Sequence, residues 1–357
     1  MSHLQTTRAA LADNSALLVT SEVNQRWLTD FAFTDGYVLV TKEKSYLITD
    51  FRYIEAARAE ADSGFTILMP EDRRMTEEIA SLLKEHKISK LLIEEDTLSV
   101  AAFERLKNAL VGVEPVGGGS AVIDGQRRFK DEDEFEKLAR AQAITDEAFE
   151  HILGYINPER TEIDVALELE FFMRSKGAES VAFDTIAVSG SASSMPHGVP
   201  RPVKLEKGFL TMDYGAKVNG YCSDMTRTVV IGKADDDMKR LYNTVLTAQK
   251  AALEALYSGE REQKKLDSIA RDIIDNAGYK GCFGHSLGHG VGMYIHEEPR
   301  LSQGVKDGEI LKAGDVVTFE PGIYIAGKYG CRIEDMVAVT ADGTRNFTKS
   351  PKELIEI

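Results

Sequence analysis

The sequence predicts an α/β domain followed by an α+β domain. The chain has 357 residues, which is more than one hydrophobic core usually accommodates. Short apolar runs alternate with helical patterns in its first third, whereas longer helical patterns and hairpin-like strands fill the remainder. Glycines at 117–119 and at Gly125 separate these two patterns. We therefore expect one domain at residues 1–125 and a second at residues 126–357.

The hydrophobic pattern predicts the individual elements. Short apolar runs between polar residues indicate buried strands, and apolar residues repeated every three or four positions indicate amphipathic helices. In KDEDEFEKLARAQAITDEAFEHIL an acidic first turn also favours a helix start, because it complements the helix dipole. The expected strands of the first domain are 16–20, 37–40, 46–48, 66–69 and 91–93. The expected helices of the chain are 52–62, 74–86, 99–110, 133–155, 162–176, 236–258 and 264–277.

Composition and charge exclude several classes of protein. The formal net charge is −15, so neither nucleic acid nor an anionic membrane is an expected partner. The start of the chain has no cationic segment followed by an apolar run, and no window of about 18 apolar residues occurs later. Cys222, Cys282 and Cys331 fit no metal-ligand spacing and cannot all pair. We therefore expect a cytoplasmic protein with reduced cysteines.

The segment FLTMDYGAKVNGYCSDMTRTVVI predicts a β-hairpin that carries two aspartates. Asn219 and Gly220 suit a two-residue type I′ turn, in which both residues have a positive φ. That turn would place residue 215 opposite residue 224, with Asp213 on the same face as residue 215. Asp213 and Asp224 would then be diagonal neighbours, about 7–8 Å apart at their Cα atoms, and could share a pair of metal ions. The alternative is a pair of solvated aspartates on an edge strand.

Two glutamates lie on strands where an unpaired charge is costly. DVVTFEPGIY predicts a buried strand that ends at Pro321-Gly322 and leaves Glu320 at its end. In YGCRIEDMVAVT, strand alternation places Arg332 and Glu334 on one face. A carboxylate in such apolar surroundings needs an ionic partner or a metal ion. For Glu334 the alternative is a surface ion pair with Arg332.

Four histidines follow residue 190. They are His197, His285, His289 and His296, three of which lie in the glycine-rich stretch GHSLGHGVGMYIHEEP. Glycine allows a backbone to come close to a bound group. We interpret His285 as a hydrogen-bonded residue and the other three as partners of carboxylates or metal ions. A phosphate-binding loop at GHGVG is a weaker alternative, because the helix and acidic residue of a dinucleotide fold do not follow it.

Together these residues predict a dinuclear metal site. Its ligands would be Asp213, Asp224, His289, Glu320 and Glu334. Four carboxylates and one imidazole carry too much negative charge for one structural zinc ion, but they suit two divalent ions that share ligands. We therefore expect the protein to catalyse metal-assisted hydrolysis.

The motifs MDYG, DMTRT, HSLGHGVG, HEEP, TFEPGIY and RIED, with MPHG upstream, resemble the prolidase and aminopeptidase P family of metallopeptidases. NQRWLTDFAFTDGYVLVT and LITDFRY resemble the N-terminal domain that this family shares with creatinase. The resemblance implies a creatinase-like α/β domain followed by an α+β catalytic domain with the pita-bread fold. It also implies two divalent ions per subunit, typically Mn²⁺ with Co²⁺ or Zn²⁺ as substitutes, bridged by Asp224 and Glu334.

The same resemblance implies roles for the residues around the metal ions. The matching positions are His197, His296 and Arg332 for substrate contact and support of the ligands, His285 beside the ligand histidine, and Tyr324 beside the metal-bound oxygen. Arg332 would orient Glu334. A hydroxide bridging the metal ions would attack the scissile carbonyl, and Glu320 would carry the proton to the leaving nitrogen. His197 and His296 would hydrogen-bond the carbonyl or the oxyanion.

Members of this family act on peptides with proline at the second position, whose tertiary amide has no hydrogen to offer a protease subsite. We expect an Xaa-Pro aminopeptidase that forms a homodimer. The alternative within the family is an Xaa-Pro dipeptidase (prolidase), in which Arg300 would pair with the free carboxylate of a dipeptide. Remoter alternatives are methionine aminopeptidase, which usually lacks the first domain and the HEEP segment, creatinase, which works without metal, and a catalytically inactive binding homologue, which would have lost ligands.

Overall fold

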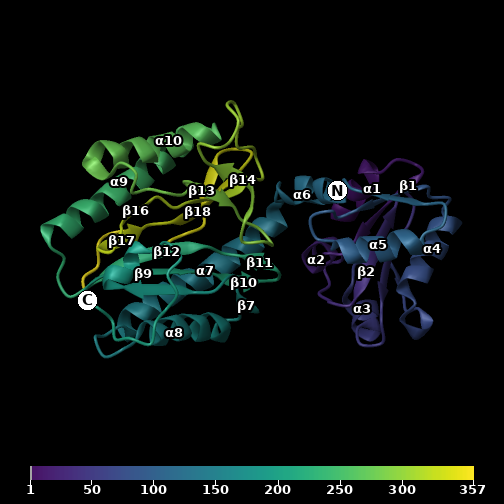
Figure 1. The fold of residues 1–357 in the computed structure, drawn as a ribbon, viewed down its shortest axis with the longest axis horizontal. Coiled ribbons are helices and arrows are strands. Elements are labelled where there is room, and N and C mark those ends of the chain that lie inside the picture. Colours follow the sequence, from purple (N-terminus) through teal and green to yellow (C-terminus); the bar gives the residue numbers. More distant parts are fainter. Residues whose placement is uncertain (1) are drawn as a thin grey trace. The chain divides into compact units, whose positions relative to one another are not determined.

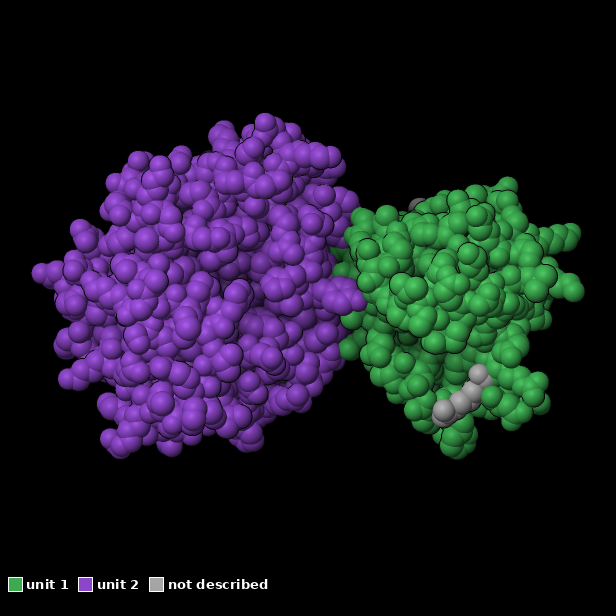
Figure 2. Space-filling model, in the orientation of Figure 1, with its two compact units in different colours: residues 1–127 green, residues 128–357 purple. Residues whose placement is uncertain are grey.

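The computed structural model describes residues 2–357 and divides into two compact units, one ending at Arg127 and one beginning at Arg128 (Figures 1 and 2). This division falls close to the boundary expected at residue 125. The first unit is α/β and the second is α+β, so the predicted fold class is confirmed. Within residues 2–357, no helix combines the length and the apolar character that crossing a membrane requires.

The first unit is built on a mixed six-stranded sheet. Its strands are β1 Ser15–Val19, β2 Gly36–Thr41, β3 Ser45–Thr49, β4 Thr66–Leu68, β5 Lys90–Ile93 and β6 Glu114–Val116, in the spatial order β4-β3-β2-β1-β5-β6. Its helices are α1 His3–Ala10, α2 Glu22–Thr29, α3 Ile54–Glu60, α4 Met75–Glu85, α5 Val100–Ala109 and α6 Gly119–Arg127, with the 3-10 turn η1 Glu71–Arg73. Every residue of β1 and β3 is buried, as expected for strands that are covered on both faces.

The sequence does not predict α1, α2, α6 or β6. The short helix α1 depends on a capping box between Ser2 and Gln5, which stabilises a helix that has few apolar positions. Helix α6 begins at Gly119, one of the glycines that we interpreted as chain breakers. A Cβ atom at this position would lie 2.4 Å from the carbonyl oxygen of Ile93. This glycine therefore allows α6 to approach β5 closely, and it does not end the regular structure.

The second unit places β-sheets between two pairs of helices (Figure 1). The helices are α7 Glu132–Tyr155, α8 Glu162–Ser175, α9 Asp236–Tyr257 and α10 Gln263–Ile274, with the shorter turns η2 Gly190–Ser194 and η3 Asp275–Tyr279. The first half of the strands comprises β7 Ser180–Val181, β8 Ile186–Ser189, β9 Gly208–Tyr214, β10 Ala216–Val218, β11 Tyr221–Cys222 and β12 Met225–Ile231. The second half comprises β13 Gly288–Gly290, β14 Glu297–Leu301, β15 Val316–Phe319, β16 Gly322–Ile325, β17 Tyr329–Arg332, β18 Asp335–Val339 and β19 Thr344–Asn346.

Each pair of helices buries its own set of strands. Helices α7 and α8 pack on the sheet β12-β9-β8, with Leu169 and Met212 in the shared core. Helices α9 and α10 pack on the strands β15 to β18, with Leu266 and Phe319 in a second core. The sheets β14-β13-β15-β18-β19 and β16-β17 belong to this second half. The two layers of strands thus face each other between the helix pairs, and the candidate site lies where their ends meet.

A buried carboxylate at the start of α8 fixes the segment that carries His197. Glu162 is fully buried, and its Oε1 accepts hydrogen bonds from the backbone N of Ser189 at 2.7 Å and from Nη2 of Arg201 at 2.6 Å. Its Oε2 accepts from the backbone N of Arg201 at 2.9 Å. Although burial raises the pKa of Glu162, the hydrogen bonds from Arg201 and Ser189 outweigh it and lower the pKa below its usual value. The carboxylate therefore joins both ends of the chain between residues 189 and 201.

We expect Glu162→Gln to lower the free energy of unfolding at pH 7 by about 2–4 kcal/mol, because the amide cannot accept all of these hydrogen bonds and leaves Arg201 without its counter-ion. The lowered pKa means that the wild-type carboxylate stabilises the fold at neutral pH and loses this effect as the pH falls below about 4. Urea unfolding at pH 7 and pH 3 should therefore show a smaller difference between variant and wild type at pH 3.

Glu206→Gln is the matched control, because Glu206 also pairs with Arg201 but its side chain is 43% exposed. An exposed pair of this kind contributes less than about 1 kcal/mol. Equal destabilisation by both substitutions would contradict the assignment of the anchoring role to Glu162.

Candidate metal centre and cavity

The predicted hairpin forms with the expected register. Asn219 and Gly220 both have positive φ, at 50° and 85°, and Val218 pairs with Tyr221 across them. The same register continues between β9 and β12, where Asp213 lies opposite Thr226. Asp224 directly precedes β12 and is 4% exposed. The alternative of two solvated edge-strand aspartates is therefore wrong for this pair.

The remaining candidate ligands come from three neighbouring strands of one sheet. His289 is the central residue of β13, Glu320 directly follows β15, and Glu334 directly precedes β18. Strand β15 pairs with β13 on one side and with β18 on the other. A Cβ atom at Gly288 would lie 1.9 Å from the carbonyl oxygen of Thr318. Glycine at this position therefore allows β13 to lie close enough to β15 for His289 to reach the carboxylates.

The continuous strand expected around Arg332 and Glu334 is wrong. Arg332 ends β17, which pairs with β16, whereas Glu334 precedes β18 in the five-stranded sheet. The chain therefore changes sheet at Ile333. Both side chains nevertheless reach the same cavity.

One cavity of about 350 Å³ brings the predicted residues together. Its lining includes all five candidate ligands, Asp213, Asp224, His289, Glu320 and Glu334, and also His197, His285, His296, Arg300 and Arg332. Ligand atoms of Asp224, His289 and Glu334 all lie within 4.8 Å of one another. The Nε2 atom of His289 lies 3.5 Å from Oδ2 of Asp224 and 3.3 Å from Oε1 of Glu320. Side chains separated by more than 100 residues in the sequence thus converge at one place.

The protonation of these groups fits a bound cation. The Nδ1 atom of His289 lies 3.0 Å from the carbonyl oxygen of Gly290, so Nδ1 carries the proton and Nε2 presents a lone pair to the two carboxylates. Burial lowers the pKa of His289 to about 3, so the ring is neutral and does not supply a positive charge to balance the neighbouring carboxylates. The buried Oδ1 atom of Asp213 has no hydrogen-bond partner among the described residues. Lone pairs that face one another in this way suit divalent ions with oxygen and imidazole ligands.

The carboxylates also repel one another when no cation is bound. Burial, and next the charge of Glu334, raise the pKa of Asp224 well above its usual value. Burial, and next the charge of Glu320, raise the pKa of Glu334 in the same way. Burial raises the pKa of Glu320 to about 8. These ligands therefore favour a bound cation, and without one the carboxylates repel one another and tend to be protonated.

Arg332 supports the ligands by contacts that differ from the expected ones. Its Nη2 donates to Oδ2 of Asp213 at 2.6 Å, and its Nε donates to Oγ1 of Thr226 at 2.8 Å. The Thr226 hydroxyl in turn donates to Oε2 of Glu334 at 2.7 Å. The expectation that Arg332 orients Glu334 directly is therefore wrong, because the threonine hydroxyl lies between them. Sequence reasoning missed Thr226, although the hairpin register already places it opposite Asp213.

His285 and Tyr324 form a chain of hydrogen bonds behind Arg332. Nη1 of Arg332 donates to the Tyr324 hydroxyl at 2.7 Å, and this hydroxyl lies 3.0 Å from Nε2 of His285. Nδ1 of His285 lies 2.9 Å from the carbonyl oxygen of Ser286, which fixes the tautomer so that Nε2 accepts from Tyr324. Burial and the charge of Arg332 lower the pKa of His285 to about 4. This histidine is therefore neutral and hydrogen-bonded, in agreement with its interpretation from the sequence.

The open side of the cavity carries the residues expected to contact a substrate. His197 and His296 are exposed, and the ring of His296 lies edge-on to His289 with 4.4 Å between ring centroids. Arg300 lies opposite His289 in the ladder between β13 and β14. Within residues 2–357, its guanidinium has neither a hydrogen-bond nor an ion-pair partner. Sequence reasoning missed the apolar part of the lining, which comprises Phe183, Ile186, Pro196 and Ile295.

Comparisons with known proteins agree with this arrangement. Residues 136–341 match the metallopeptidase family M24, and residues 4–129 match the creatinase/prolidase N-terminal domain. The solved structure of an Xaa-Pro dipeptidase from Bacillus anthracis is 41% identical, with a TM-score of 0.93 and 99% of each chain covered. That of an X-Pro aminopeptidase from Thermotoga maritima MSB8 is 34% identical, with a TM-score of 0.91, and covers 98% of this chain and 99% of its own. An Xaa-Pro dipeptidase from Pyrococcus furiosus is 40% identical over 321 residues, which are 90% of this chain and 89% of that protein.

Proposed function

Because this chain belongs to metallopeptidase family M24, with the pita-bread catalytic fold behind a creatinase-type domain, we propose that it hydrolyses the bond between an N-terminal residue and a following proline. The observation that carries the proposal is the convergence of five candidate ligands, one imidazole and four carboxylates, on one cavity. All five positions hold residues that can bind a metal ion. An inactive binding homologue would have lost some of these ligands, and creatinase works without metal, so the complete set argues against both alternatives.

Asp213, Asp224, His289, Glu320 and Glu334 would hold two divalent ions, with Mn²⁺ as the proposed metal and Co²⁺ or Zn²⁺ as substitutes. Bound ions would polarise the scissile carbonyl and make water acidic enough to act as a nucleophile near neutral pH. The structure supports this proposal through the unpartnered Oδ1 atom of Asp213 and the lone pair of His289 that faces two carboxylates.

Glu320 is the proposed proton carrier. The Thr318 hydroxyl donates to its Oε1 at 3.2 Å, which holds the carboxylate at the end of β15 facing the cavity. A carboxylate at this position can accept a proton from the attacking water and deliver it to the proline nitrogen as the bond breaks. His197 and His296, on the open side of the cavity, are placed to donate hydrogen bonds to the carbonyl oxygen. Arg332 holds Asp213 and, through Thr226, Glu334.

Arg300 favours a dipeptidase over an aminopeptidase. Its guanidinium reaches the cavity without a partner from the described residues, and a planar guanidinium binds a free carboxylate with two hydrogen bonds. In a dipeptide, that carboxylate belongs to the proline residue next to the scissile bond. The aminopeptidase activity expected from the sequence remains the second candidate, and the structure of the Thermotoga maritima aminopeptidase is the observation that supports it.

Release of free N-terminal alanine tests the proposed function and the length preference together, because hydrolysis of any of the three peptides below produces it. The purified protein, loaded with Mn²⁺, would be incubated with Ala-Pro, Ala-Ala and Ala-Pro-Ala. We expect rapid hydrolysis of Ala-Pro, little hydrolysis of Ala-Ala, and a lower kcat/KM for Ala-Pro-Ala than for Ala-Pro. Equal rates for Ala-Pro and Ala-Pro-Ala would support the aminopeptidase, and no cleavage before proline would refute the proposed function.

We expect Arg300→Met to raise KM for Ala-Pro about 10- to 100-fold with a smaller change in kcat, because the variant loses a charge-assisted pair of hydrogen bonds to the substrate carboxylate. The same variant should change KM for Ala-Pro-Ala little. Initial rates over a range of substrate concentrations provide both constants. The matched control is Arg240→Met, because the Arg240 side chain is 66% exposed and pairs with Asp237 at the surface. An unchanged KM for Ala-Pro in Arg300→Met would remove the support for a dipeptidase.

A further inference from the structure

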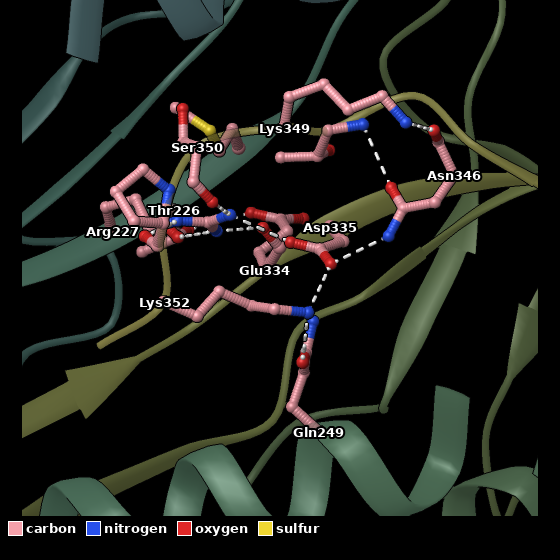
Figure 3. A network of polar contacts seen from close by, with 12 residues as sticks. Thr226, Arg227, Gln249, Glu334, Asp335, Asn346, Lys349, Ser350 and Lys352 are labelled. Carbon is pink, nitrogen blue, oxygen red and sulfur yellow. Dashed lines mark hydrogen bonds and ion pairs between the residues drawn. The ribbon is translucent and has the colours of Figure 1, made fainter. Parts of the chain in front are cut away.

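A buried polar network surrounds Asp335 and includes Glu334, one of the candidate metal ligands (Figure 3). Its centre is the ion pair between Arg227 of β12 and Asp335 of β18, and both side chains are 1% exposed. Neither residue lines the cavity. The network therefore belongs to the interior of the second unit and has no direct access to a substrate.

Arg227 uses all five of its N–H donors. Nη1 donates to the carbonyl oxygens of Thr226, at 3.0 Å, and of Glu334. Nη2 donates to Oδ1 of Asp335 at 2.9 Å and to the carbonyl oxygen of Ser350 at 2.8 Å. Nε donates to the carbonyl oxygen of Pro351 at 3.0 Å. One guanidinium thus joins β12, the residue before β18 and the C-terminal segment.

The residues that accept hydrogen bonds from Arg227 have further partners of their own. Oδ2 of Asp335 accepts from Nζ of Lys352 at 2.7 Å and from Nδ2 of Asn346 at 2.9 Å. Asp146 of α7 accepts from the backbone N of Ser350 at 2.9 Å. Figure 3 shows Lys352 and Asn346 reaching Asp335 from different directions. The acceptors of Arg227 are therefore fixed by their own partners.

Thr226 holds both the backbone and the carboxylate of Glu334. The N–H of Glu334 donates to the carbonyl oxygen of Thr226 at 3.1 Å, and its Oε2 accepts from the Thr226 hydroxyl at 2.7 Å. Arg227 adds the third connection, because its Nη1 bonds the carbonyl oxygens of both residues. Asp224 lies two residues before Thr226 on the same chain. The spacing of the two most enclosed carboxylates of the site thus depends on the contacts of one buried arginine.

We propose that Arg227 is a positioning residue of the metal centre, which sets the distance between the chain at Asp224 and the chain at Glu334. Folding alone does not explain a charge pair at this place, because a buried ion pair often stabilises a protein no better than apolar residues of the same volume. Residues that orient metal ligands from behind affect metal affinity. The inference rests on the metal site of the proposed function.

Arg227→Lys tests the proposal with metal affinity as the readout. A lysine ammonium has three N–H donors on one atom and cannot reach the carbonyls of Glu334 and Pro351 from one position. Titration calorimetry of the metal-free protein with MnCl₂ should show at least one Mn²⁺ bound about tenfold or more weakly than in the wild type. Thermal unfolding of the metal-free variant, measured in parallel, reports the contribution of the arginine to folding alone.

Lys352→Met is a milder variant for the case in which Arg227→Lys does not fold, since it removes one of the two donors to Oδ2 of Asp335. Lys233→Met is its matched control, because Lys233 is 85% exposed and pairs with Glu356 elsewhere on the C-terminal segment. Mn²⁺ should bind more weakly to Lys352→Met than to Lys233→Met. Wild-type affinity and stoichiometry in Arg227→Lys, or in Lys352→Met if the first variant does not fold, would overturn the proposal and leave the network a folding anchor. A wild-type protein that binds no Mn²⁺ would overturn the proposed function instead.

Discussion

Glu320→Gln is expected to lower kcat for Ala-Pro by about 10²- to 10⁴-fold, the range that general acid–base catalysis contributes. Glutamine keeps the shape of the side chain and one oxygen, but it cannot accept a proton at neutral pH. Burial raises the pKa of Glu320 to about 8 in the metal-free protein, and bound cations would lower it, so that the carboxylate can act as a base at neutral pH. Initial rates at saturating substrate between pH 5 and pH 9 provide the measurement.

The metal content of the variant must be measured beside its activity, because Glu320 is also a candidate ligand. A variant that still binds two Mn²⁺ but has lost its activity supports the proton-carrier role, whereas loss of one ion assigns the defect to ligation. Glu309→Gln is the matched control, since Glu309 is an exposed glutamate of the same unit, and it should keep wild-type kcat. Retention of more than a tenth of the activity by a fully loaded Glu320→Gln would refute the role of this residue.

The hairpin shows how much of the site local sequence can predict. The turn residues Asn219 and Gly220 determine the register, and strand alternation then places Asp213 and Asp224 on one face. The same reasoning puts Glu320 at the end of an apolar strand that Pro321 terminates. Each of these predictions depends on residues within about ten positions of one another, where turn chemistry and alternation act directly.

The contacts that support the ligands could not be predicted in this way. Arg332 bonds Asp213 across 119 positions of the sequence, and Arg227 bonds the carbonyl oxygen of Glu334 across 107 positions. Alternation also gave no sign that the chain changes sheet at Ile333, because a strand that passes from one sheet to another keeps its alternating pattern. Such contacts depend on how separate sheets pack, and the spacing of residues within one strand does not contain that information.

Gly119 illustrates a second limit. A glycine that ends a helix and a glycine that lets a helix approach a strand look the same in the sequence. The structure separates the two cases, because a Cβ atom at Gly119 would meet the carbonyl oxygen of Ile93. The helix α6 was therefore missed for a steric reason that only the neighbouring strand reveals.

Removal of the divalent ions is expected to reduce Ala-Pro hydrolysis by about 10³-fold or more, because metal ions contribute several kcal/mol of transition-state stabilisation. Activity would be measured after dialysis against EDTA and again after addition of MnCl₂, which should restore it. Full activity in a protein shown to contain no metal would refute a metal-dependent mechanism.

Metal removal should also make stability depend on pH in a defined direction. The pKa of Asp224 and Glu334 is raised well above the usual value, and that of Glu320 is raised to about 8. A carboxyl group whose pKa is raised by folding stabilises the fold fully below its unfolded pKa, near 4, and loses this effect as the pH rises through its folded pKa. The Tm of the metal-free protein should therefore fall between pH 5 and pH 8.

Mn²⁺ binds the deprotonated carboxylates, so the increase in Tm on adding MnCl₂ should be larger at pH 8 than at pH 5. An increase that is equal at both pH values would show that these carboxyl groups do not bind the metal, and the five-residue site would have to be abandoned even if the enzyme proved to be metal-dependent.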